Sequence, residues 1–334
     1  MTGDYDPIPE LQKLGYTERE AAFLYLVGIH SGYFLRRQYL SFIDREDGAM
    51  VQRFLEKSIG LDHTRPIEYA AGRHIYHLKS KLIYRILGQE DSQNRRTKGD
   101  RQIKARLMQV DYLLDHFGEQ FLETSDQKVR FFEDTLEIPT DSLPQAQYPN
   151  AGSPVYFPDR FPVCVEQERG QSAPSVSLVF IDDGLRSISA FVRFLEQYAQ
   201  LLAALHRAEV IYTSDNSRNF DEAEHQFLRR FPPSSITKEF PRGLDHFLSY
   251  LKIEAELARH GSIPSAMVKV LDEGRELYTE LEHRALKITW EMGNTNERKI
   301  RALFEPEMKQ VSIRSCLLAH DYPVWSMKYR RAVL

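Results

Sequence analysis

The order of the elements predicted between residues 17 and 78 constrains the fold of this chain most. Thr17 and Glu20 have the spacing of a helix capping box, and apolar residues follow them at helical spacing. Two more amphipathic helices are predicted at about 35–43 and 49–59, separated by the charged turn DREDG, and two strand-like runs around the turn AAGR come next. Three helices followed by a hairpin are the order of a winged helix, in which the third helix enters the major groove of duplex DNA.

The third predicted helix has one apolar and one polar side. Its apolar residues Val51, Phe54 and Leu55 are expected to anchor it to the other two helices, leaving a polar face outward. Gln pairs with adenine and Arg with guanine in the major groove, so this face is a candidate for base contacts. Its residues are Gln52, Arg53 and Lys57.

Arginines flank the predicted hairpin and are candidates for phosphate contacts, which position a protein on DNA without reading sequence. Together with the turn before the third helix and the chain after the hairpin, they complete the predicted DNA-binding set. That set is Arg45, Gln52, Arg53, Lys57, Arg65, Arg73, Arg95, Arg96 and Lys98. The alternative for each residue is a merely solvated surface.

The charge distribution favours a local contact with phosphates. Residues 36–106 hold 16 Lys and Arg against 9 Asp and Glu, a net charge of +7, while the whole chain is at −4 and the remainder therefore at −11. A basic block on an acidic chain has the sign that suits a polyanion. A solvated basic surface is the alternative here as well.

Three regions are predicted along the chain. Residues 1–90 form the winged-helix domain, 91–118 a basic helical connector, and 119–334 an α/β domain with C-terminal helices. In the third region a short helix, three strand-like runs, a strongly periodic helix at about 185–206 and a further strand follow one another. That order predicts a mixed α/β layer and is also the order of the PD-(D/E)xK nuclease fold.

Two groups of segments resemble the plasmid replication-relaxation family. They are YFLRRQYLSFI with HIYHL in the first part, and YFPDRFPV with VSLVFIDDGLRSISAFVRFLEQY in the second, within about residues 15–230. The resemblance implies a winged helix, a basic connector and a nuclease-like α/β domain. It also implies a DNA-binding protein of bacterial mobile elements, acting in plasmid maintenance, transfer or local transcription.

Three acidic residues make a metal-dependent nuclease the alternative function. Asp159, Glu166 and Asp182 are candidate ligands for Mg²⁺, the only cofactor that this alternative requires. However, the run FIDDGLR has no Lys two residues after an acid to orient the attacking water. Asp182 and Asp183 with Gly184 instead fit a turn that also caps the next helix. The favoured interpretation is therefore a non-catalytic DNA-binding protein without metal or cofactor.

The C-terminal third is predicted to be helical. One helix covers about 244–258, and an unusually long one about 264–292, with a narrow apolar stripe. Such a stripe pairs two copies into a homodimer or packs back on the α/β domain, and both alternatives stay open. A third possible function is that of a protein-interaction component of a defence or transfer complex. It is expected if the polar face of the third helix is covered by the protein's own chain.

The remaining composition indicates a cytoplasmic protein. The N-terminus MTGDYDPIPE is acidic and polar, which is not typical of a secretory signal. The two cysteines make no disulfide framework, and no apolar run reaches the length of about 20 residues that spans a bilayer. No membrane contact is expected.

Overall fold

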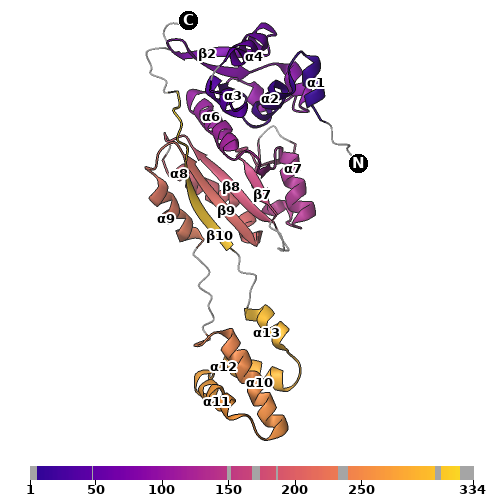
Figure 1. The fold of residues 1–334 in the computed structure, drawn as a ribbon, viewed down its shortest axis with the longest axis vertical. Coiled ribbons are helices and arrows are strands. Elements are labelled where there is room, and N and C mark those ends of the chain that lie inside the picture. Colours follow the sequence, from indigo (N-terminus) through magenta and orange to yellow (C-terminus); the bar gives the residue numbers. More distant parts are fainter. Residues whose placement is uncertain are drawn as a thin grey trace. The chain divides into compact units, whose positions relative to one another are not determined.

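The computed structural model describes residues 6–46, 48–148, 152–167, 174–185, 187–231, 240–304 and 310–323. It has the mixed α and β composition expected from the sequence. The chain forms two compact units, one of residues 1–231 with 310–334 and one of residues 232–309 (Figure 1).

Unit 1 begins with a small helical and three-stranded part. Its elements are α1 (Ile8–Lys13), α2 (Glu18–His30), β1 (Tyr33–Leu35), α3 (Arg36–Phe42), α4 (Ala49–Gly60), β2 (Thr64–Ala70), β3 (Arg73–Leu78) and α5 (Lys81–Ile86). The strands form an antiparallel sheet in the order β1-β3-β2. The predicted helices and hairpin are confirmed, whereas β1, which pairs with Ile75–His77, was not predicted.

Aromatic side chains hold α2, α3 and α4 together. The ring of Phe54 on α4 lies 4.2 Å from that of Tyr39 and 6.0 Å from those of Phe23 and Phe34. With Val51, these residues are almost fully buried. The predicted apolar side of α4 therefore does anchor it, because rings at these separations fill the space between helices.

The second part of unit 1 is a five-stranded sheet. Its strands are β4 (Gln120–Phe121), β7 (Val163–Glu166), β8 (Ser175–Asp182), β9 (Arg207–Ser214) and β10 (Gln310–Leu317). The order is β10-β9-β8-β7-β4; β8, β9 and β10 are parallel, and β7 and β4 are antiparallel to their neighbours. Three of the four predicted strands are confirmed in this sheet as β7, β8 and β9, whereas the first predicted run, at Val155–Tyr156, pairs with Gln145–Ala146 outside it.

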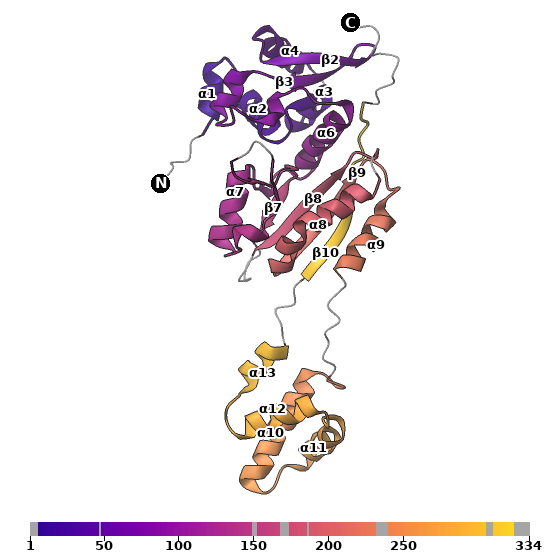
Figure 2. The same ribbon diagram turned by 180° about the vertical axis from the view of Figure 1, so that it is seen from behind.

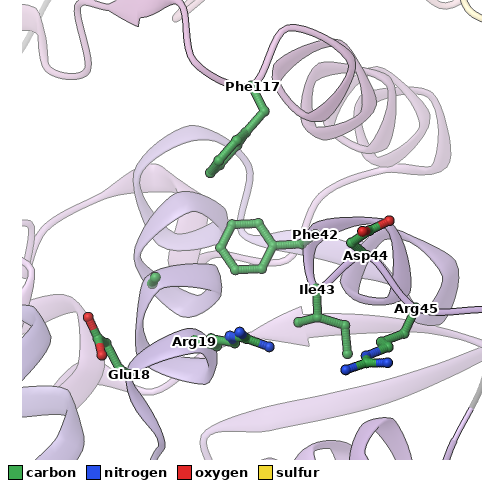
Figure 3. A pocket seen from close by; sticks show the side chains of 8 residues that line it. Glu18, Arg19, Phe42, Ile43, Asp44, Arg45 and Phe117 are labelled. Carbon is green, nitrogen blue, oxygen red and sulfur yellow. The ribbon is translucent and has the colours of Figure 1, made fainter.

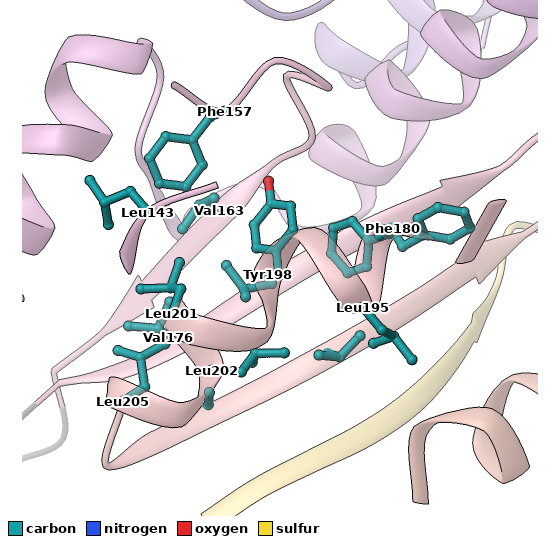
Figure 4. Packing of buried hydrophobic residues seen from close by; sticks show 14 of the residues in the cluster. Leu143, Phe157, Val163, Val176, Phe180, Leu195, Tyr198, Leu201, Leu202 and Leu205 are labelled. Atoms are coloured by element: carbon teal, nitrogen blue, oxygen red, sulfur yellow. The ribbon is translucent and has the colours of Figure 1, made fainter. Parts of the chain in front are cut away.

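Helices cover both faces of this sheet (Figures 1 and 2). One face carries α8 (Ser189–Ala204) and α9 (Phe220–Arg230), and Figure 4 shows Tyr198, Leu195 and Leu202 of α8 on the strands. Shorter elements surround the edge of β7. They are α7 (Ser125–Arg130), η2 (Phe131–Thr135), η3 (Thr140–Ser142), β5 (Gln145–Ala146) and β6 (Val155–Tyr156).

The helix predicted in the basic connector lies between the two sheets of unit 1. It is α6 (Asp100–Asp115), preceded by the short η1 (Gln93–Arg95). Ile103, Leu107 and Met108 form one buried cluster with residues of both sheets. The small sheet contributes Tyr33, Leu35 and Ile75, and the large sheet Val179, Ile181 and Ile211. This helix is thus buried on two sides.

Unit 2 is helical and has its own core. Its helices are α10 (Leu244–His260), α11 (Ser265–Leu277), α12 (Leu281–Glu291) and α13 (Glu297–Phe304). The prediction of one long helix over 264–292 was wrong, because α11 ends at Leu277 and α12 begins at Leu281. Tyr278, 5% exposed, leaves the helix and packs its ring 4.8 Å from that of Phe247. No described helix combines the length and the apolar composition that crossing a bilayer requires.

Candidate nucleic-acid interface

The outward face of α4 carries the residues predicted to contact bases. Gln52 and Arg53 are exposed, while Val51, Phe54 and Leu55 on the opposite side are buried. The apolar side comes from residues spaced three and four apart, so the polar residues between them are turned outward. Gln52 and Arg53 therefore stand on a helix that is fixed from beneath.

Hydrogen bonds order part of this face and leave one cation available. The amide Nε2 of Gln52 donates to Glu56 Oε1 at 2.8 Å, and Arg36 Nη1 donates to Gln52 Oε1 at 3.4 Å. Among the described residues, the guanidinium of Arg53 has neither a hydrogen bond nor an ion pair. Arg53 is thus free to bind an external acceptor.

Lys57 is held by the protein itself. Its Nζ lies 2.6 Å from Glu20 Oε2 and 2.9 Å from the carbonyl oxygen of Gly15, over the ring of Tyr16. Glu20 is buried, and in the capping box its carboxylate accepts from the backbone N–H of Thr17. Lys57 therefore joins α4 to the start of α2, and of the three predicted α4 residues it is the one held by an ion pair.

The hairpin places its two arginines at exposed positions. Arg65 lies two residues before Ile67 on β2, and Arg73 two residues before Ile75 on β3; both isoleucines belong to the cluster around α6. Because strand side chains two residues apart point to the same face, both arginines leave the hairpin on the face toward α6, opposite α4. Gly72, with φ +69°, makes the turn beside Arg73.

The basic residues after the hairpin lie across the same face of the small sheet. Tyr33, His77 and Arg65 form one row over its three strands. The hydroxyl of Tyr33 donates to the carbonyl of Arg96 at 3.3 Å and accepts from the backbone N–H of Lys98 at 2.9 Å. Through these two hydrogen bonds, Tyr33 holds the segment of Arg96 and Lys98 against the small sheet.

The other members of the predicted set differ in exposure. Arg96 is exposed and Lys98 half-buried; burial, followed by repulsion from Arg106, lowers the pKa of Lys98. Arg95 is half-buried, and its Nε has no hydrogen-bond partner among the described residues. Arg45 is exposed in the turn between α3 and α4, apart from that row.

Arg36 was not predicted as part of this surface. It begins α3, next to Gln52 of α4, whereas its neighbour Arg37 forms a bidentate pair with Asp111 of α6, at 2.6 and 2.7 Å. Two adjacent arginines thus point to different parts of the molecule. The sequence carries no signal that separates them, because each of the two positions follows the same short strand.

The structure does not bring the three candidate nuclease carboxylates together. Glu166 pairs with Ser175 at one end of β8, and Asp182 is at the other end, seven residues away. At roughly 3.3 Å per residue this separates them by about 23 Å. Asp159 is elsewhere, accepting from Tyr198 at 3.1 Å, and burial raises its pKa. These residues cannot hold one ion.

Asp182 is bound on both oxygens by groups of the protein. Its Oδ1 accepts from the backbone N–H of Gly184 at 3.0 Å, and its Oδ2 accepts from the Tyr212 hydroxyl and from Asn219 Nδ2. The predicted Asp-Asp-Gly turn is confirmed, since Asp183 Oδ1 likewise accepts from the N–H two residues on. The predicted helix cap was wrong: α8 begins later, and no side chain caps it.

In the described parts of the chain, no three His, Cys, Asp or Glu side chains are grouped so that they could hold a metal ion. The chain matches no family model, no curated protein and no solved structure. The arrangement of its own residues therefore carries the functional argument.

Proposed function

We propose that unit 1 is a duplex DNA-binding protein and that its first part is a winged helix. The observation that carries this proposal is the element order α2-β1-α3-α4-β2-β3 with the sheet order β1-β3-β2, in which α4 is anchored by its apolar side and exposed by its polar side. In a helix-turn-helix protein the helix in this position enters the major groove.

The roles of the residues follow from their surroundings. Arg53 has no partner in the described protein and is assigned to a base edge, with Gln52 beside it. Arg73 at the hairpin turn is assigned to phosphate. Arg65 and Arg96 are exposed and are assigned to a separate backbone contact, because Arg65 leaves the small sheet on the face opposite α4. Lys57 is assigned no contact with DNA, because Glu20 and Gly15 already bind it.

Fluorescence anisotropy with a labelled duplex tests the proposal. Binding is expected at low salt and is expected to weaken steeply as salt is added. Arg53→Gln is expected to weaken binding by about 5- to 150-fold, the loss of one base contact of about 1–3 kcal/mol. Arg85→Gln is the matched control, because Arg85 is exposed on α5 and paired with Glu90. Absence of binding to any duplex at low salt refutes the proposal.

The α/β layer is proposed to be nuclease-like in ancestry and non-catalytic. The run β7-β8-α8-β9 supports the first statement, and the separation of Glu166 from Asp182 supports the second. Plasmid DNA incubated with the protein and Mg²⁺ or Mn²⁺ is expected to stay intact. Cutting by the wild type that is lost in Asp182→Asn would establish the nuclease alternative instead.

A role in plasmid maintenance, transfer or transcription, as in the replication-relaxation family, remains part of this proposal, and so does a homodimer. The break between α11 and α12 at Tyr278 removes the long apolar stripe that predicted a homodimer. Two half-sites on DNA remain its support, since winged-helix proteins often bind such sites as dimers. Sedimentation equilibrium of the free protein measures the oligomeric state directly.

A further inference from the structure

A cavity of about 260 Å³ lies between α2 and the segment that joins α6 to β4. One wall is a face of α2 with Tyr25 and His30, and the other includes His116, Phe117 and Glu119. A wider hollow of about 640 Å³ adjoins it and shares Phe42 and Phe117 as lining (Figure 3). The proposed DNA contacts use none of the cavity's lining residues.

His30 is a nearly buried polar residue in the lining of the cavity. It is 8% exposed and lines the cavity, and no described residue makes a hydrogen bond to its ring. Burial, followed by the charges of Lys128 and Arg106, lowers the pKa of His30 to about 3, so the ring is neutral. Buried polar groups normally have a partner, and this one is available to a bound molecule.

The cavity offers acceptors and negative charge. Its lining contains Glu119 and Glu123 and no Lys or Arg. Glu123 accepts from the hydroxyl of Tyr25 and Glu119 from the thiol of Cys164, and neither carboxylate has an ion-pair partner among the described residues. Glu119 is exposed and Glu123 half-buried, so this side of the cavity carries two carboxylates that attract a cationic ligand.

His116 adds another acceptor. Its Nδ1 lies 2.8 Å from the carbonyl oxygen of Tyr112, which can only accept, so Nδ1 carries the proton. In the neutral ring Nε2 is then an acceptor. A ligand with N–H donors therefore fits the acceptors of this cavity.

Aromatic rings complete the lining. Tyr25, Phe42, Phe117 and Phe121 all contribute, and the face of such a ring attracts a cation. Phe117 is 73% exposed and packs edge-on against Phe42, with the ring centroids 5.7 Å apart. Phe117 lines both the cavity and the wider hollow, so its ring is available to a bound cation.

We infer that this cavity binds a small organic cation with a primary ammonium or guanidinium group. Glu119 and Glu123 balance its charge, His30 and His116 accept its N–H groups, and the rings of Phe42 and Phe117 cover its carbon chain. The volume matches a molecule of a few carbons rather than a nucleotide, since drug-sized sites begin at about 300 Å³.

Isothermal titration calorimetry of the full chain without DNA tests this inference. Putrescine and agmatine are the probes, and 1,4-butanediol and succinate have the chain length of putrescine with neutral and negative ends. Saturable binding of at least one of the two amines, with none of the diol or the diacid, is expected. No saturable heat with either amine, or equal binding of the diol, would overturn the inference.

Two variants place the binding in this cavity. Glu123→Gln is expected to weaken the amine by roughly tenfold or more, because a charge-assisted hydrogen bond becomes a neutral one. Phe117→Ala, at an exposed position that folding does not depend on, is expected to weaken it by about 2- to 5-fold. The matched controls Glu133→Gln and Tyr148→Ala are exposed and outside the lining, and are expected to bind as the wild type. Unchanged affinity in both cavity variants would refute the site.

Discussion

Replacing Asp182 by Ala is expected to destabilise unit 1, and the size of the loss follows from its hydrogen bonds. The side chain is 3% exposed and accepts from Gly184, Tyr212 and Asn219. Tyr212 is 1% exposed, so its hydroxyl loses its acceptor without access to water. One buried unsatisfied donor costs about 1–3 kcal/mol, and with the other two bonds the expected loss is about 3 kcal/mol.

Urea denaturation followed by circular dichroism measures this loss. With an m value of about 3 kcal/mol/M for a unit of this size, the midpoint of the unit 1 transition should fall by about 1 M. Asp182→Asn keeps the shape and one acceptor oxygen and should lose about a third as much. A midpoint equal to that of the wild type would refute the structural role.

Three further outcomes are expected. Lys57→Met should lower stability by about 1 kcal/mol, because Glu20 loses its partner, while the affinity for duplex DNA changes by less than twofold. The pKa of His30 is about 6.5 in the unfolded chain and is lowered to about 3 in the folded one. Between these two pH values unfolding takes up a proton, so acidification to pH 5 should lower the free energy of unfolding by about 2 kcal/mol. The His30→Gln variant should not show this loss. Gly274→Ala would place a Cβ 2.2 Å from the Tyr250 ring and should destabilise unit 2 by about 2 kcal/mol, measured by urea denaturation with tryptophan fluorescence.

Local patterns predicted most of the elements. The capping box at Thr17, the apolar period of α4 and α8 and the turn at Gly72 are short-range signals that the structure repeats. The sequence did not indicate β1, because Tyr33–Leu35 is only three residues long and depends on pairing with β3. The break after Leu277 was missed for a similar reason, since Tyr278 leaves the helix to fill a core that forms only in three dimensions.

The candidate site was harder to predict than the fold. Residue type alone gave Gln52 and Arg53, and the exposure of both agrees with that choice. Lys57 looked equivalent in sequence, yet its partner Glu20 is 37 residues away and belongs to another helix. The same limit applied to the carboxylates: Glu166 and Asp182 are close in sequence, but two antiparallel strands carry them to opposite ends of the sheet.

The position of α6 decides how the first part of unit 1 relates to the second. The face of the small sheet that carries Tyr33, Leu35 and Ile75 is apolar, and α6 covers it. The other side of α6 meets β8 and β9 through Val179 and Ile211. Neither sheet buries its apolar face without this helix, and an uncovered face of that kind costs about 25 cal/mol for each Å² left in water. The winged helix that we propose is therefore not tethered to the α/β layer by a flexible connector. The two share one core, which α6 completes.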